Sequence, residues 1–149
     1  MSIEYRSINA NTIEKIDDIF GEGTAQFVVV LDDGFLLEAY DGDSLVGFIN
    51  VTPRALTYTL EHLKDAYIET VEVHEKYRRR GIGRALILAA QEWAIQQGFK
   101  QIRTHHDNEA AAAIKMSMSL GFGMCPHAYS DVEGCEGYHV AKVLAGGNI

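Results

Sequence analysis

Apolar positions recur every three or four residues in three segments, a pattern that predicts three amphipathic helices. The first is expected over residues 11–20, where a polar cap precedes the apolar residues Ile13, Ile16, Ile19 and Phe20. The second follows a glycine pair at residues 81–83 and stops at Gly98, with an apolar stripe of Leu86, Ala89, Ala90 and Trp93. The third is the alanine-rich segment 108–120, which Gly121 ends.

Runs rich in β-branched residues predict four strands between these helices. Residues 35–40 and 45–51 are expected to pair as a hairpin, because the Asp-Gly turn at 41–43 tolerates left-handed conformations. Residues 66–73 form the next strand, and residues 99–104 another.

Three segments are less clear. The run at residues 27–31 is too short for periodicity to separate a buried strand from part of a second helix, and both interpretations stay open. Residues 52–65 are polar-rich and predict a connection that leaves the hairpin. The tail offers two more strand-like pieces, one around Tyr129 and one over residues 138–144.

Composition favours one globular domain over residues 1–149, since 47% of the residues are hydrophobic and no linker or repeat interrupts the chain. The element order predicts an α+β fold. Two cysteines are too few for a disulfide framework, so we expect a cytoplasmic protein. A net charge of −8 argues against nucleic acid as a partner, and no apolar run is long enough to cross a membrane.

The segment from residue 78 to residue 84 predicts an anion site. The first N–H groups of a helix have no intrahelical partner and bind phosphate where glycine leaves them uncovered, as at Gly81 and Gly83. Guanidinium groups surround this helix start at Arg78, Arg79, Arg80 and Arg84. A dinucleotide fingerprint would need a third glycine where Leu86 stands, and an ATP-type phosphate loop would need Gly-Lys-Ser/Thr. The segment therefore indicates a diphosphate site that belongs to neither of these two motifs.

These residues carry a family resemblance. Arg78-x-x-Gly81-x-Gly83, with Val71-x-Val73 before it and Leu120-Gly121-Phe122 after it, resembles the acetyl-CoA signature of the GNAT superfamily of N-acyltransferases. The resemblance spans nearly the whole chain and implies a mixed, bent sheet that opens where the cofactor enters.

The same resemblance implies how acetyl-CoA binds as co-substrate. Main-chain groups of the strand would hold the pantetheine arm, and the arginine and glycine loop would bind the pyrophosphate. Asn108 has two interpretations, a cofactor contact or a simple helix cap. The residues expected to bind the cofactor are Val71, Val73, Arg78, Arg79, Arg80, Gly81, Ile82, Gly83, Arg84 and Asn108.

Acetyl transfer to an amine needs a proton acceptor, and two strand glutamates are candidates. Glu69 comes first, because the resemblance to antibiotic-modifying members gives it a matching glutamate, and Glu72 comes second. Simple alternation puts Glu69 on the face of Val71 and Val73 and Glu72 on the other. The backbone N–H of Val73 is the expected oxyanion donor by the same resemblance.

The resemblance also implies a tyrosine beside the departing thiolate, and Ser117 stands at that position. Either Ser117 acts weakly, or a water protonates the sulfur, or another group such as Tyr129 or Tyr138 reaches in.

Histidines and cysteines near the end of the chain form a second group of candidate functional residues. His105 and His106 point to opposite faces of a strand and are expected at a substrate cleft or the surface. A zinc site would have the right ligand types at Cys125, His127, Cys135 and His139, but the spacing is not that of a paired-cysteine knuckle, so no metal is expected.

The sequence therefore predicts an acetyl-CoA-dependent N-acetyltransferase that transfers acetyl directly, in a ternary complex, to a small-molecule amine or a peptide amino terminus. The acceptor is expected to be cationic, because the chain around the basic loop is acidic. Two alternatives stay open, a non-catalytic acyl-CoA-binding domain on the same fold and a small zinc-stabilised interaction module. The resemblance also leaves a homodimer open.

Overall fold

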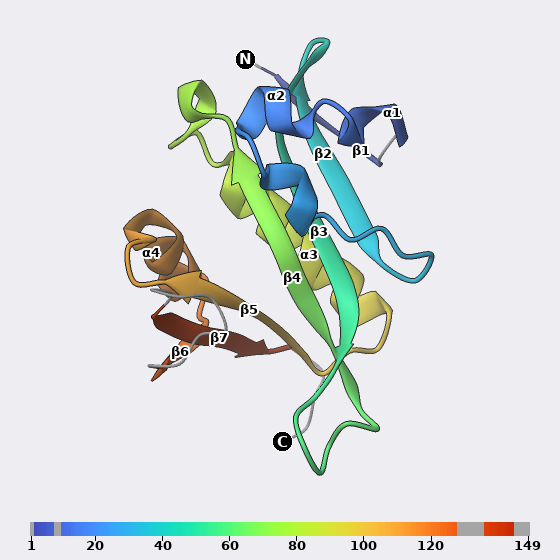
Figure 1. Ribbon diagram of the computed structural model, residues 1–149, viewed down its shortest axis with the longest axis vertical. Helices are drawn as coiled ribbons and strands as arrows, with labels where there is room; N and C mark the ends of the chain where they lie inside the picture. The colour runs from blue at the N-terminus through green and yellow to red at the C-terminus, as the bar shows by residue number, and fades with distance from the viewer. Residues whose placement is uncertain (1, 8–9, 128–135, 145–149) are drawn as a thin grey trace.

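The computed structural model describes residues 2–7, 10–127 and 136–144. Its centre is a mixed seven-stranded sheet in the order β1-β2-β3-β4-β5-β7-β6, in which only β4 and β5 run parallel (Figure 1). The strands are β1 (Ile3–Ser7), β2 (Phe35–Asp41), β3 (Ser44–Ala55), β4 (Lys64–Val73), β5 (Gln101–Asp107), β6 (Gly123–His127) and β7 (Gly137–Val143). The expected α+β fold with a mixed sheet is confirmed.

Helices cover both faces of the sheet. They are α1 (Ala10–Ile13), α2 (Ile16–Phe20), α3 (Ile82–Gln96) and α4 (Ala111–Ser119), with short 3-10 turns η1 (Thr24–Phe27) and η2 (Glu75–Tyr77). Helix α3 lies along one face of β3 and β4, and α2 with η1 lies on the other (Figure 1).

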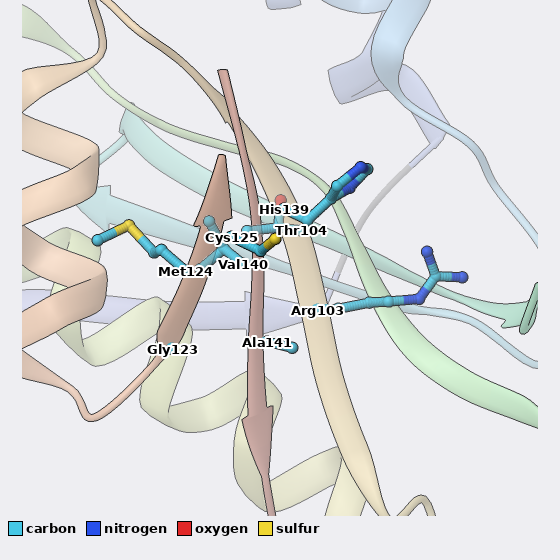
Figure 2. A pocket seen from close by; sticks show the side chains of 8 residues that line it. All are labelled: Arg103, Thr104, Gly123, Met124, Cys125, His139, Val140 and Ala141. Carbon is cyan, nitrogen blue, oxygen red and sulfur yellow. The ribbon is translucent and has the colours of Figure 1, made fainter. Parts of the chain in front are cut away.

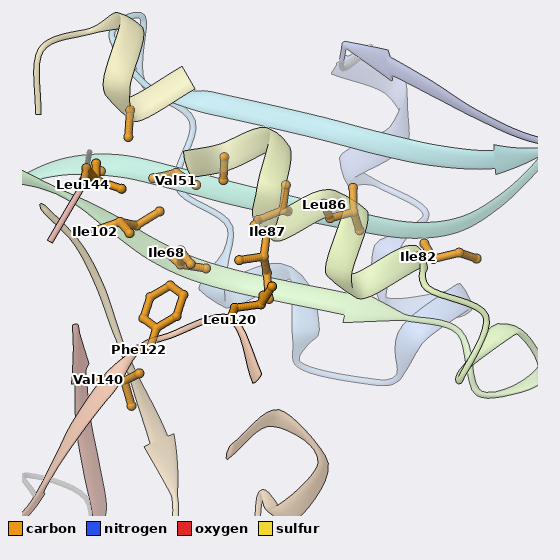
Figure 3. Packing of buried hydrophobic residues seen from close by; sticks show 14 of the residues in the cluster. Val51, Ile68, Ile82, Leu86, Ile87, Ile102, Leu120, Phe122, Val140 and Leu144 are labelled. Atoms are coloured by element: carbon orange, nitrogen blue, oxygen red, sulfur yellow. The ribbon is translucent and has the colours of Figure 1, made fainter. Parts of the chain in front are cut away.

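The main core fills the space between α3 and the sheet. Leu86 and Ile87 of α3 pack over buried side chains of the strands, which include Val51, Ile68 and Ile102 (Figure 3). Gly47 permits this packing, because a Cβ there would lie 2.9 Å from the Glu72 carbonyl oxygen and 3.3 Å from Ile82. On the opposite face, Phe20 packs edge-on against Phe48 at 5.1 Å between ring centroids.

A β-bulge in β4 changes which residues share a face. Asn50 pairs with Thr70 and Val51 pairs with Ile68, so Glu69 is an extra residue in β4. Glu72 lies directly opposite Phe48 and therefore faces α2, and Glu69 bonds Thr52 on the same face. The prediction from alternation was therefore wrong: the two glutamates share one face, while Val71 and Val73 pack into the α3 core.

Strands β4 and β5 separate soon after they meet. Their register pairs are Ala66 with Ile102 and Tyr67 with Arg103, and one further link joins the Thr104 hydroxyl to the Ile68 carbonyl at 3.0 Å. Beyond this point β4 and β5 diverge (Figure 1). The last five residues of β4, 69–73, therefore have no strand pairing on the β5 side.

Several predicted elements were wrong in type or extent. The amino-terminal strand β1 was not predicted, and the expected helix over 11–20 is two short helices, α1 and α2. Strand β3 continues to Ala55, into the segment expected to leave the hairpin. Helix α4 begins at Ala111 rather than Asn108.

The undecided run at 27–31 is neither strand nor helix beyond the last residue of η1. It is held by a side chain instead: the Val29 N–H donates to Asn50 Oδ1 at 2.7 Å, and Asn50 Nδ2 donates back to the Val29 carbonyl at 2.9 Å. Of the two expected tail strands, β6 ends at His127, and Tyr129 lies outside the described residues.

Candidate active site

The start of α3 exposes backbone donors where β4 and β5 separate. Gly81 precedes the helix with a φ of +80° and no side chain caps the helix there. The first helical hydrogen bond runs from the Ala85 N–H to the Gly81 carbonyl, so the N–H groups of residues 82–84 have no intrahelical acceptor. These donors and the positive end of the helix dipole form an anion site.

Arginine side chains surround this helix start. Arg78 Nε donates to the Val73 carbonyl at 3.1 Å, and Arg80 stacks over the Tyr77 ring at 5.3 Å. Arg79 and Arg84 are exposed. The structure thus brings the four predicted arginines and the two glycines to one helix start.

The candidate strand residues Val71 and Val73 are half-buried, with side chains against the core. Gly83 packs close to this strand, since a Cβ there would lie 3.6 Å from Val73 Cγ2.

Glu72 lines a cavity of about 170 Å³ between α2 and the end of β4. Burial raises the pKa of the Glu72 carboxyl, and the nearby Arg78 charge partly opposes that rise. The residues lining this cavity are Ile19, Phe20, Glu72, Val73, His74, Glu75 and Arg78.

Glu69 is already engaged by neighbouring side chains. Its carboxylate accepts from Thr52 Oγ1 at 2.6 Å and from two Arg54 nitrogens at 2.9 and 2.6 Å. Its side chain is only 8% exposed, and Arg54 also stacks 3.9 Å from the Tyr67 ring centre. Sequence reasoning missed Thr52 and Arg54, because it ended the strand that carries them before residue 52.

Ser117 of α4 is 3% exposed and lies 2.8 Å from His106 Nε2 of β5. Burial lowers the pKa of His106, and the charge of His105 acts in the same direction, while a backbone hydrogen bond with His105 and the charge of Asp107 oppose it. No local sequence pattern indicates this pair, because the two residues belong to different elements.

Asn108 lies in the turn between β5 and α4. Its N–H donates to the Glu136 carbonyl at 3.0 Å, and Ala110 occupies the N-cap position of α4. The interpretation of Asn108 as a helix cap is therefore wrong, while its contact with a cofactor stays a prediction.

Three imidazoles gather on adjacent strands, those of His105, His127 and His139. Their ring centroids are 4.5 to 6.1 Å apart, and His105 contacts His127 through its Nε2. His105 and His106 do point to opposite faces, toward this cluster and toward Ser117 respectively.

Among the described residues, no group of three or more His, Cys, Asp or Glu has the geometry to hold a metal ion. Cys125 lies beside His139 and lines a cavity of about 340 Å³ on β5, β6 and β7 (Figure 2). Cys135, the fourth residue of the considered zinc set, lies outside the described residues. Within the described part of the chain, no helix is long and apolar enough to span a membrane.

Solved structures share this fold over nearly the whole chain. NAA60 from Arabidopsis thaliana, in complex with a bisubstrate analogue, has 22% sequence identity and a TM-score of 0.79, covering 98% of this chain and 100% of that one. Naa50 from Arabidopsis thaliana, in complex with the bisubstrate analogue CoA-Ac-MVNAL, has 22% identity and a TM-score of 0.74, covering 97% and 100%. The ribosomal-protein alanine N-acetyltransferase from Escherichia coli has 17% identity and a TM-score of 0.71, covering 99% of both chains. At these identities the likenesses show the fold.

Family membership comes from the sequence comparison. A sequence model of the acetyltransferase (GNAT) family matches residues 9–122, which include the diverging strand β4, the arginine loop and the end of α4. The chain therefore belongs to the acetyltransferase (GNAT) family.

Proposed function

We propose that this acetyltransferase transfers the acetyl group of acetyl-CoA to a primary amine, either of a small molecule or of a peptide amino terminus, by direct attack in a ternary complex. One observation carries the proposal: the opening between β4 and β5 lies beside an uncapped helix start surrounded by four arginines. An extended cofactor with a diphosphate at one end fits that combination of an open strand edge and an anion site.

In this proposal the pyrophosphate binds the N–H groups of residues 82–84 and the guanidinium groups around them, with Ile82 contributing through its backbone. The pantetheine arm follows the open edge of β4 and bonds the main chain of Val71 and Val73. Arg78 then has to leave the Val73 carbonyl, which it now occupies, and move to the phosphates. Asn108 is the proposed contact on the far side of the opening.

The proton acceptor is Glu72 rather than Glu69. Three hydrogen bonds already use the Glu69 carboxylate, and one of its partners is a charged guanidinium. Burial raises the pKa of Glu72 toward the range in which a carboxylate takes a proton from an ammonium most effectively. The Val73 N–H is the proposed donor to the oxyanion that forms on the acetyl carbonyl.

The acceptor is proposed to be cationic. Removing the four loop arginines from the net charge of −8 leaves −12 for the rest of the chain, which favours a protonated amine near the site. The neighbours include two complexes with bisubstrate analogues, one of which carries the peptide MVNAL, and these support peptide amino termini as an acceptor class to test.

The test measures release of coenzyme A from acetyl-CoA in the presence of polyamines, aminoglycosides, amino acids and peptides with different amino termini. We expect release that depends on one amine class and is lost in Arg78→Ala, with Arg6→Ala on the edge strand β1 as the control. Acetyl-CoA binding without acetylation of any amine in the panel would instead favour the non-catalytic acyl-CoA-binding domain. Ser117 is the reason to test this alternative, because it stands where the family resemblance implies a tyrosine.

A further inference from the structure

The loop over residues 74–81, which joins β4 to α3 and carries three of the arginines, is attached to the β2–β3 hairpin at two points. The His74 N–H donates to the Val46 carbonyl of β3 at 2.8 Å. The Tyr77 hydroxyl donates to Asp41 Oδ2 at 3.0 Å, and Asp41 is the last residue of β2 before the hairpin turn. The turn and the loop lie at the same end of the sheet, at the top of Figure 1. Tyr77 therefore links the arginine loop to a turn 36 residues earlier in the sequence.

Tyr77 also contacts one arginine of the anion site. The guanidinium carbon of Arg80 lies 5.3 Å from the centre of the Tyr77 ring, within the range of a cation–π interaction. The hydrogen bond to Asp41 is the largest cause of a raised pKa at the Tyr77 hydroxyl, while the Arg80 charge opposes the rise. The carboxylate thus holds the hydroxyl end of a ring whose face supports a guanidinium.

The backbone between Tyr77 and α3 depends on support from its surroundings. Arg79 has a φ of +62°, in the left-handed region that residues with a Cβ rarely adopt. Such a residue keeps its conformation only where the flanking structure fixes it. On the helix side, the hydrogen bond from the Ala85 N–H to the Gly81 carbonyl fixes the loop. On the strand side, the bond from Tyr77 to Asp41 does so.

We propose that the hydrogen bond from Tyr77 to Asp41 positions the arginine loop for the diphosphate of coenzyme A, so that the β2–β3 turn contributes to cofactor affinity from outside the binding site. The proposal rests on the proposed function, because it needs a diphosphate at the start of α3. Tyr77 and Asp41 act through Arg80 and the loop backbone, and they are therefore positioning residues.

The direction of the effect separates positioning from simple electrostatics. Asp41 carries a negative charge close to an anion site, so removing that charge would tighten the binding of coenzyme A if charge alone mattered. If the bond to Tyr77 holds the loop, Asp41→Ala weakens binding instead. Tyr77→Phe keeps the ring and the net charge and removes the hydroxyl, so it should weaken binding as well.

Calorimetric titration with coenzyme A measures the effect. We expect the dissociation constant to rise about tenfold in Asp41→Ala and in Tyr77→Phe, a usual size for one hydrogen bond to a charged group. The double variant should lose little more, because both changes remove the same bond. Asp41→Asn keeps an oxygen that can accept the bond and should lose less than Asp41→Ala. The KM for acetyl-CoA should rise in parallel, with kcat at saturating acetyl-CoA unchanged.

Asp43→Ala is the matched control, since it removes the same charge from the same hairpin turn. Its dissociation constant for coenzyme A should be unchanged or lower. Thermal unfolding of each variant shows whether the protein is folded at the temperature of the titration. A purely structural role for the bond would lower the unfolding midpoint and leave the affinity of the folded protein unchanged.

Each outcome decides. An unchanged or lower dissociation constant in Asp41→Ala and Tyr77→Phe, equal weakening by Asp43→Ala, or additive effects in the double variant overturns the inference and leaves the proposed function standing. Failure of the unmodified protein to bind coenzyme A at all overturns both. Tight binding without acetylation of any amine overturns the proposed transfer alone.

Discussion

Two glutamates three positions apart on β4 have been given different chemistry by their neighbours. Glu69 is the extra residue of the bulge and is held by Thr52 and Arg54 of the adjacent strand. Glu72 faces α2 at the edge of a small cavity, where burial raises its pKa. A carboxylate held by hydrogen bonds and an ion pair stabilises the sheet, whereas a desolvated carboxylate with a raised pKa is better suited to accept a proton.

Replacement of Glu72 by Gln is expected to lower kcat on the order of a hundredfold or more, because the proton acceptor is removed. In the unmodified protein kcat/KM should fall as pH drops through the raised pKa of Glu72, at a higher pH than an ordinary glutamate would give, since the base must be ionised. Glu72→Gln should lose this acidic limb of the pH–rate profile.

Glu69→Gln is the matched comparison, as it changes the same charge on the same strand. It should keep the pH profile and lower the midpoint of thermal unfolding instead, because it breaks the ion pair with Arg54. A pH profile altered by Glu69→Gln and untouched by Glu72→Gln would reverse the two roles.

A second buried carboxylate, Glu38 of β2, should make stability depend on pH. Burial raises the pKa of Glu38, although hydrogen bonds from Tyr40 and Thr12 oppose the rise. The folded state then holds this proton to higher pH than the unfolded chain does, so stability falls as pH rises from the ordinary glutamate range through the raised pKa. Urea unfolding at several pH values should show that Glu38→Gln loses this part of the fall, while Glu4→Gln on the exposed strand β1 keeps it.

At the scale of elements, the position of α3 determines the anion site. The helix approaches β3 closely at Gly47, where a Cβ would meet the Glu72 carbonyl and the Ile82 side chain. The same packing places the first turn of α3 beside the open edge of β4, with Gly83 against Val73. The position of these backbone donors therefore depends on a contact made by Gly47 of β3, which β4 separates from α3 in the sequence.

Gly47→Ala is expected to destabilise the fold by about 1–3 kcal/mol, the usual cost of overpacking a filled core. Because the Glu72 carbonyl of β4 has to shift and Ile82 at the start of α3 has to move slightly, the affinity for coenzyme A should fall as well. Gly123→Ala is the control, since a Cβ there has its nearest neighbour at 3.8 Å. Calorimetric titration with coenzyme A and urea unfolding measure the two effects, and a Gly47→Ala variant with unchanged affinity would argue against this coupling.

At the scale of the whole molecule, charge is distributed unevenly. Four of the 13 basic residues surround one helix start in a chain whose net charge is −8. Such a local basic site in an acidic chain attracts an anionic ligand electrostatically. Salt screens this attraction, and the screening length is about 8 Å at physiological ionic strength.

Arg84→Gln should therefore weaken coenzyme A binding several-fold at low salt and reduce the dependence of the dissociation constant on salt. Arg6→Gln removes the same charge from β1 and should change neither. Titrations at low and high ionic strength distinguish the two variants, and equal effects of both would mean that overall charge, not the arginine cluster, controls binding.

The sequence by itself determined the features that depend on local chemistry. Helical periodicity located α3, the Asp-Gly turn located the β2–β3 hairpin, and glycines with arginines located the anion loop, because each signal lies within a few consecutive residues. The family resemblance followed from that same loop, and the fold it implied is confirmed.

Only the tertiary structure decided which of the candidate groups are available for chemistry. Alternation in β4 assigned Glu69 and Glu72 to opposite faces, and a bulge set by pairing with β3 placed them on the same one. The ion pair that engages Glu69 and the hydrogen bond that joins Ser117 to His106 each cross between elements that are distant in sequence. Such contacts depend on packing and register, which no short stretch of the sequence encodes by itself.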